Sequence, residues 1–226
     1  MFSAIHGDIR AVREHDPAAR GHLEVVLCYP GLHAVWGHRI THWLWQHNAK
    51  LAARFAAELI RKFTGVEIHP AAVLGKRVFI DHATGVVIGE TTVVGDDVTI
   101  YQGVTLGGTS LNREKRHPTI GDRVTIGAGA KVLGAITIGA DSQIGANSVV
   151  IKPVPPGSVV VGVPGQIVGL EKTNAAPPTQ SDLPDPLGAS MYSVLTRVAR
   201  LEAREQNRTE DKVIRPPEAG VWHGED

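Results

Sequence analysis

Two short groups of polar residues in this sequence carry side chains suited to proton transfer beside an anion-binding group. Asp81 and His82 are adjacent, and a histidine is the usual general base near neutral pH. Glu67 lies fifteen residues before His82, and a carboxylate can fix the tautomer of such a base. Arg116 and His117 offer a planar guanidinium, which suits a carboxylate, beside a second imidazole. The alternative is that His82 is an inert surface histidine and that Arg116 and His117 are solvated charges of a loop. The surrounding sequence pattern distinguishes a functional site from this alternative.

That pattern is an aliphatic residue that returns every six positions from Ile68 to Val150. The three series are Ile68, Leu74, Ile80 and Val86; then, after a slip of two residues, Ile88, Val94, Ile100 and Leu106; then Ile120, Ile126, Val132, Ile138, Ile144 and Val150. A period of six fits neither an amphipathic helix nor one long alternating strand. It fits a β-solenoid, in which three six-residue units close one triangular coil and the coils stack. We expect a parallel β-helix over residues 66–170, with its regular part ending at 152–157 and Gly162–Gly165 closing it.

Two departures from the repeat coincide with the polar groups. Asp81 replaces the corner residue expected after Ile80, and His82 follows it; broken local rules are expected at functional sites. Given about eighteen residues per coil, Glu67 should lie roughly one coil from His82 at the same edge. The polar segment 107–119 interrupts the repeat and must project from an edge; insertions of this kind tend to mark the binding face.

The rest of the chain predicts a helical domain at 1–65 and a tail at 171–226. Helices are expected over 8–14, from about 23 to a break at 29–31, and over 32–46, 51–63 and 191–206, with a linker at 171–190 and a mobile final segment. His38 and His42 stand one helical turn apart, which would suit a metal, but packing among helices is the better interpretation. Asp16, before Pro17, could simply end a helix.

Composition excludes several classes of protein. Lys+Arg and Asp+Glu are each 23, so the basic excess of a nucleic-acid-binding domain is absent from the sequence. The single cysteine, Cys28, suits a reducing compartment. The first residues lack the basic and apolar regions of a signal peptide, and no apolar run reaches membrane-spanning length. We therefore expect a cytoplasmic protein with no membrane or nucleic-acid partner.

The run IDHATGVVIGET at 80–91 resembles the signature of bacterial and plant serine O-acetyltransferases. Further support comes from DPA at 16–18, HRITHWLW at 38–45, and QGVTLGGT at 102–109 leading to RHP at 116–118. The resemblance covers about residues 8–170. It implies a left-handed β-helix and transfer of acetyl from acetyl-CoA to the L-serine hydroxyl, the first step of cysteine biosynthesis.

The resemblance also implies a role for each matching residue. His82 would deprotonate the serine hydroxyl, with Glu67 as its partner where many members have aspartate. Asp16 and Asp81 would hold the amino group, Arg116 the carboxylate, and His117 would bind substrate or steady the oxyanion. Acetyl-CoA would be a co-substrate rather than a resident cofactor, lying near Gly108, Thr109, Ala128 and Ala146. Attack would be direct, without an acyl-enzyme or a metal.

The family further implies a homotrimer whose sites are shared between subunits, or a dimer of trimers, with feedback binding by L-cysteine. Many members dock a C-terminal isoleucine into O-acetylserine sulfhydrylase. This sequence ends at Asp226, and burying an unpaired carboxylate is costly. We therefore expect no tight complex through the C-terminal tip.

Three other functions remain open at this point. A hexapeptide acetyltransferase could act on another hydroxyl, such as that of a sugar, although a sugar does not need the opposite charges of Asp81 and Arg116. A hydratase on the same fold could bind zinc through His69, His82 and His117. A non-catalytic scaffold would have no use for His82 with Glu67.

Overall fold

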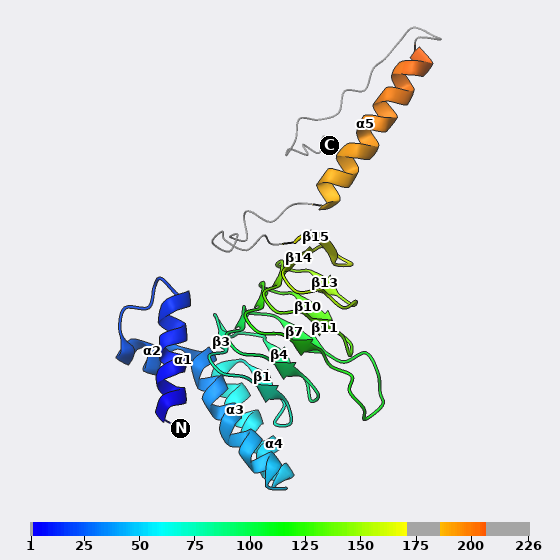
Figure 1. Ribbon diagram of the computed structural model, residues 1–226. Helices are drawn as coiled ribbons and strands as arrows, with labels where there is room; N and C mark the ends of the chain where they lie inside the picture. Colours follow the sequence, from blue (N-terminus) through cyan, green and yellow to red (C-terminus); the bar gives the residue numbers. More distant parts are fainter. Residues whose placement is uncertain (1, 171–185, 207–226) are drawn as a thin grey trace. The chain divides into compact units, whose positions relative to one another are not determined.

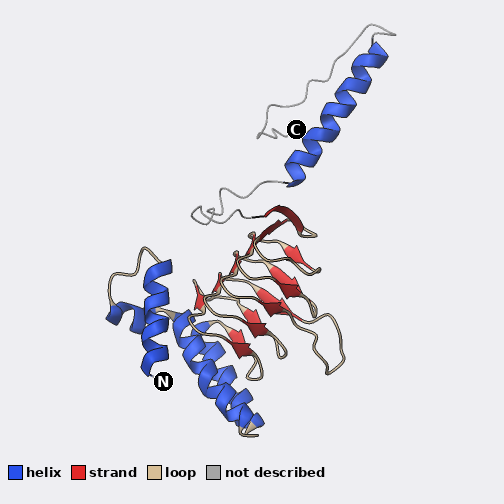
Figure 2. Cartoon of the chain, viewed as in Figure 1, coloured by secondary structure: helices blue, strands red, loops and turns tan. Residues whose placement is uncertain are grey.

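The computed structural model describes residues 2–170 and 186–206, which fall in two compact units, 1–184 and 185–226 (Figure 1). In the first unit the helices precede the strands along the chain; Figure 2 draws the helices in blue and the strands in red. The helices of the first unit are α1 (Phe2–His15), α2 (His22–Cys28), α3 (Pro30–Gln46) and α4 (Lys50–Thr64). The second unit contains α5 (Pro186–Gln206).

The strands are short and form three sheets around a triangular prism. Sheet A contains β1 (Glu67–Ile68), β4 (Val87–Ile88), β7 (Thr105–Gly107), β10 (Lys131–Leu133) and β13 (Val149–Val150). Sheet B contains β2 (Val73–Leu74), β5 (Val93–Val94), β8 (Thr119–Ile120) and β11 (Thr137–Ile138). Sheet C contains β3 (Phe79–Ile80), β6 (Thr99–Ile100), β9 (Thr125–Ile126), β12 (Gln143–Ile144), β14 (Ser158–Val161) and β15 (Gln166–Leu170). Each strand pairs in parallel with its counterpart one coil away, except β15, so the predicted left-handed β-helix is confirmed.

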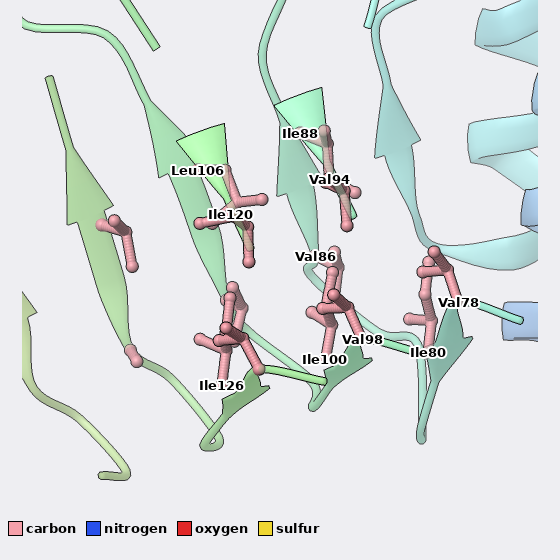
Figure 3. Close-up of a cluster of buried hydrophobic side chains, with 14 of the residues drawn as sticks. Val78, Ile80, Val86, Ile88, Val94, Val98, Ile100, Leu106, Ile120 and Ile126 are labelled. Carbon is pink, nitrogen blue, oxygen red and sulfur yellow. The ribbon is translucent and has the colours of Figure 1, made fainter. Parts of the chain in front are cut away.

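The aliphatic residues of the six-residue period form the core of the prism. Ile88 pairs with Leu106 and Ile100 with Ile126, so side chains from successive coils lie in columns (Figure 3). All four are fully buried. Full burial of one such side chain stabilises the fold by about 1.5–3 kcal/mol. The repeat folds this way because every coil covers the apolar face of its neighbour.

The prism extends beyond the predicted end at 152–157. Val154 bridges to Ile138 in parallel, and Ser158–Val161 continues sheet C beside β12. The period was missed because the step from Val150 to Val154 is four residues instead of six. β15 then runs antiparallel to β14, and the turn at 162–165 closes the prism as predicted.

One corner of the prism is longer than its counterparts. The turns that lead from sheet C to sheet A, called C–A corners below, place Ile100 and Leu106 six positions apart, whereas Ile80 and Ile88 are eight positions apart. The two-residue slip of the sequence therefore falls inside the corner 81–86.

Buried and partly buried polar contacts join the helices to one another and to the first coil. Asp8, on α1, accepts hydrogen bonds from both terminal nitrogens of Arg39 and from Trp36 Nε1. His38 donates to the Ala72 carbonyl at 3.1 Å and His42 to the Pro70 carbonyl at 2.7 Å. Both histidines thus hydrogen bond to the backbone of the first coil rather than among the helices, which supports a packing role. α1 begins at Phe2 rather than at residue 8.

The tail differs from prediction in one respect. Helix α5 begins at Pro186, so the last five residues of the predicted linker at 171–190 are helical. Residues 171–185, with most of that linker, and the final segment with its C-terminal tip lie outside the described residues. Among the described helices, none is both long and apolar enough to cross a bilayer.

Candidate active site

His82 and Ala83 are the two extra residues of the long C–A corner. Thr84 is equivalent to Gln102 of the next coil. The Thr84 carbonyl accepts a hydrogen bond from Gly103 N–H, and the Gln102 carbonyl accepts the matching bond from Gly129 N–H, one coil further on. His82 and Ala83 both adopt left-handed backbone, with φ of 53° and 54°. That conformation costs a non-glycine residue roughly 1 kcal/mol or more. The insertion leaves the His82 side chain 74% exposed, where a substrate can reach the imidazole.

The side chain of Asp81 forms a hydrogen bond at the start of this insertion. Its Oδ1 accepts the backbone N–H of His82 at 2.9 Å, and its Oδ2 lies 3.8 Å from His82 Nε2. The carboxylate of Asp81 and the imidazole of His82 therefore lie side by side at this exposed corner. Asp81 can therefore assist the neighbouring base as well as contact a substrate.

Glu67 lies on the same edge, one coil away. It opens β1, is exposed, and pairs with Val87, five residues after His82. Gly85 N–H donates to Gly65 O at 2.9 Å, which stacks the two corners directly. Within the described residues Glu67 and His82 are not hydrogen bonded to each other, so their partnership stays a prediction.

Asp16 joins this corner from the end of α1. Its Oδ1 accepts the N–H of Ala18 at 2.7 Å and its Oδ2 accepts the hydroxyl of Tyr29 at 2.5 Å. Burial, and then the charges of Asp81 and Asp16, raise the pKa of Tyr101. Both carboxylates therefore lie close to the same phenol. The charges of Asp81 and Asp16, which both act on Tyr101, make this corner electronegative, which suits an ammonium group.

Sequence reasoning missed the two tyrosines. Burial, the hydrogen bond to Asp16 and the Asp16 charge raise the pKa of Tyr29, so its hydroxyl stays a donor. Tyr101 follows the strand that pairs with β3, and so stands one coil from Asp81. The available signal was weak: Tyr101 occupies a corner position where later coils have glycine.

Arg116 and His117 lie at the base of the loop that projects between β7 and β8, as predicted (Figure 1). Arg116 Nη2 donates to Glu90 Oε2 at 2.6 Å, and Lys115 Nζ donates to the Thr91 carbonyl at 2.6 Å. His117 is buried, and burial followed by the Arg116 charge lowers its pKa. The contributions of Glu90 and Thr91 were also missed, since they act across coils.

The predicted residues fall into two groups at different corners. His82, Asp81, Ala128 and Ala146 lie in C–A corners, and Asp16, after α1, and Glu67, at the start of β1, stand at the same edge of the prism; the turns from sheet A to sheet B carry Gly108, Thr109, Arg116 and His117. One prism face separates the groups, about 13 Å for four extended residues. A single chain therefore presents two half-sites, one acidic with an exposed imidazole and one basic.

The separation of the two corners also bears on the alternative zinc site of His69, His82 and His117. His69 lies near His117, whose charge contributes to lowering the His69 pKa to about 4, after burial and Arg54. His82 belongs to the other corner. Within the described part of one chain, the three rings do not converge.

Residues 117–152 match the family described as bacterial transferase hexapeptide (six repeats). The serine acetyltransferase of Mycobacterium tuberculosis is 67% identical over 226 residues, which cover 100% of this chain and 99% of that protein. The chain belongs to the serine acetyltransferases. The Bacillus subtilis member is 49% identical over 211 residues, 93% of this chain and 97% of the relative.

Solved serine acetyltransferases share the fold. The Neisseria gonorrhoeae enzyme in complex with serine superposes with a TM-score of 0.72 and 45% identity, covering 74% of this chain and 69% of that one. The Brucella abortus enzyme in complex with coenzyme A gives 0.74 and 46%, covering 76% and 68%. A further member in complex with cysteine gives 0.75 and 46%, covering 76% and 67%. The resemblance drawn from the sequence motifs is confirmed at the level of family and fold.

Proposed function

We propose that this chain transfers the acetyl group of acetyl-CoA to the hydroxyl of L-serine, giving O-acetyl-L-serine and CoA. The observation that carries the proposal is the 67% identity to a serine acetyltransferase over the whole chain. The arrangement of charges supports serine over a sugar, because carboxylates and a guanidinium match the two ends of a zwitterion.

The acidic half-site would bind and activate the hydroxyl. Asp16 and Asp81 hold the ammonium group, which brings the serine oxygen to the exposed imidazole of His82. His82 takes the hydroxyl proton as the oxygen attacks the thioester carbon, and Asp81 and Glu67 stabilise the imidazolium. The C–S bond then breaks, and the proton passes to the leaving CoA thiolate.

The basic half-site would hold the carboxylate. The planar guanidinium of Arg116 can donate two hydrogen bonds to a carboxylate, and its bond to Glu90 already orients it. His117 lies beside Arg116. Because the half-sites lie on different corners, a complete site needs the basic half of a second copy. We therefore infer a homotrimer with one site at each junction between prisms; a dimer of trimers would contain the same sites.

Acetyl-CoA would lie along the groove between two prisms. Gly108 and Thr109 come from one side, and Ala128 and Ala146 from the other. Small side chains let a pantetheine arm approach the coil backbone closely. L-cysteine, with the same charged ends as serine, would compete at the serine site.

The activity is tested by CoA release from acetyl-CoA with serine, homoserine, threonine and galactosides. Serine should give the highest kcat/KM, whereas preference for a galactoside would favour the sugar alternative.

Shared sites are tested by mixing two inactive variants, His82→Ala and Arg116→Ala. Co-assembled chains should regain part of the activity, because some junctions then combine two intact halves. Absence of recovery in verified mixed oligomers would place each site within one chain.

A further inference from the structure

Thr91 makes an unusual set of hydrogen bonds beneath the basic half-site. Its Oγ1 accepts the backbone N–H of Arg116 and that of His117, each at 3.0 Å. The same hydroxyl lies 2.9 Å from His117 Nδ1, and the Thr91 backbone N–H donates to that nitrogen at 3.2 Å. The Thr91 side chain thus forms hydrogen bonds with both Arg116 and His117.

These contacts fix the protonation of the His117 ring. A backbone N–H can only donate, so His117 Nδ1 must be the acceptor nitrogen. The Thr91 oxygen already accepts two hydrogen bonds, which leaves its own hydrogen for Nδ1. A neutral imidazole that accepts at Nδ1 carries its proton on Nε2.

The surroundings keep that ring neutral and its Nε2 edge in place. A β-carbon at Gly89 would collide with the Cδ2 and Nε2 atoms, and one at Gly108 would lie 3.2 Å from Nε2. Arg116, Lys115 and His69 face the ring with positive or titratable groups, and Glu90 is the opposing carboxylate. His117 Nε2 has no hydrogen-bond partner within the described part of the chain.

We propose that Thr91 is a positioning residue, which locks His117 as a neutral Nε2–H donor toward the substrate and holds the Arg116 backbone beside it. His117 then acts as a hydrogen-bond donor and not as a second base, because its Nδ1 lone pair is occupied. The substrate part of this proposal rests on the proposed function; the tautomer and the role of Thr91 do not.

The test is NMR of the full-length protein with ¹⁵N-labelled histidine, the His117 signals being assigned by their loss in His117→Gln. The expected result is the Nε2–H tautomer, with a pKa below the ordinary value for histidine. In Thr91→Val the lost hydroxyl should raise the His117 pKa and increase the KM for serine roughly tenfold, with less than a twofold change for acetyl-CoA. Thr91→Ser should restore both properties.

Thr92→Val is the matched control, since the buried Thr92 hydroxyl has no hydrogen-bond partner within the described residues. It should leave the His117 signals and the serine KM unchanged. A proton on Nδ1, or a His117 that titrates at its ordinary pKa in the unmodified chain, would overturn the proposal even if Thr91→Val fails to fold. An Nε2–H tautomer in a chain that does not acetylate serine would support the role of Thr91 and refute the proposed function.

Discussion

Replacing Tyr29 with phenylalanine tests whether the acidic half-site depends on an oriented carboxylate. The change removes only the hydroxyl that donates to Asp16 Oδ2 at 2.5 Å. Asp16 keeps the backbone donor of Ala18 on its other oxygen, so the carboxylate stays in place but gains freedom to rotate. We expect weaker serine binding with the fold intact.

The magnitude follows from the kind of bond that is lost. Hydrogen bonds to charged groups contribute about 1.5–3 kcal/mol. Asp16 is only partly buried, so water can replace part of the lost donor and the lower figure applies. About 1.5 kcal/mol corresponds to roughly a tenfold rise in the KM for serine.

The assay is CoA release at saturating acetyl-CoA with serine varied, and then the reverse. Tyr192→Phe on the exposed face of α5 is the matched control and should change neither constant. An unchanged serine KM in Tyr29→Phe would refute the role given to Asp16. An equal rise in both Michaelis constants would indicate a displaced α1 instead.

Four further outcomes are expected. His82→Ala should lower kcat by roughly two to four powers of ten, and Glu67→Gln by less, because an amide can still orient the ring; both are read from CoA release. Arg116→Lys should raise the KM for serine more than that for acetyl-CoA, since lysine lacks the planar fork. Ile126→Ala should lower the free energy of unfolding by about 3 kcal/mol in urea titrations, because Ile126 is fully buried. Burial lowers the pKa of His38 to about 4, so between its unfolded pKa of 6.5 and pH 4 the unfolded chain binds a proton that the folded chain does not. Stability should fall on acidification through that range, and His38→Gln should flatten the slope, measured as urea midpoints from pH 7.5 to 4.5.

The sequence predicted the prism well because coil stacking repeats a local pattern. Each inward residue, such as Ile100, is followed six positions later by the next, and its environment is set by its own neighbours in sequence. The end of the prism was misplaced because the step from Val150 to Val154 shortens at a proline-rich corner. Only the pairing with Ile138 reveals that the coil continues.

The candidate site was partly predictable for a similar reason. His82 was found because it breaks the repeat, and its structural cause, an inserted pair of residues, is visible as a slip of two. Tyr29 and Thr91 leave no such mark. They act through hydrogen bonds to Asp16, 13 residues away, and to His117, 26 residues away, so only the folded chain brings them together.

The closing hairpin and the N-terminal helices have a consequence for self-association. A stack of parallel coils ends in unpaired peptide groups, which invite the coil of another molecule to add. At the end of sheet C, β15 runs against the direction of the other strands and offers no parallel template. At the other end α3 lies so close to Ile80 that only a glycine, Gly31, fits between them. The antiparallel strand at one end and the packed helix at the other therefore prevent further coils from adding. Without them, the solenoid could lengthen into a fibre.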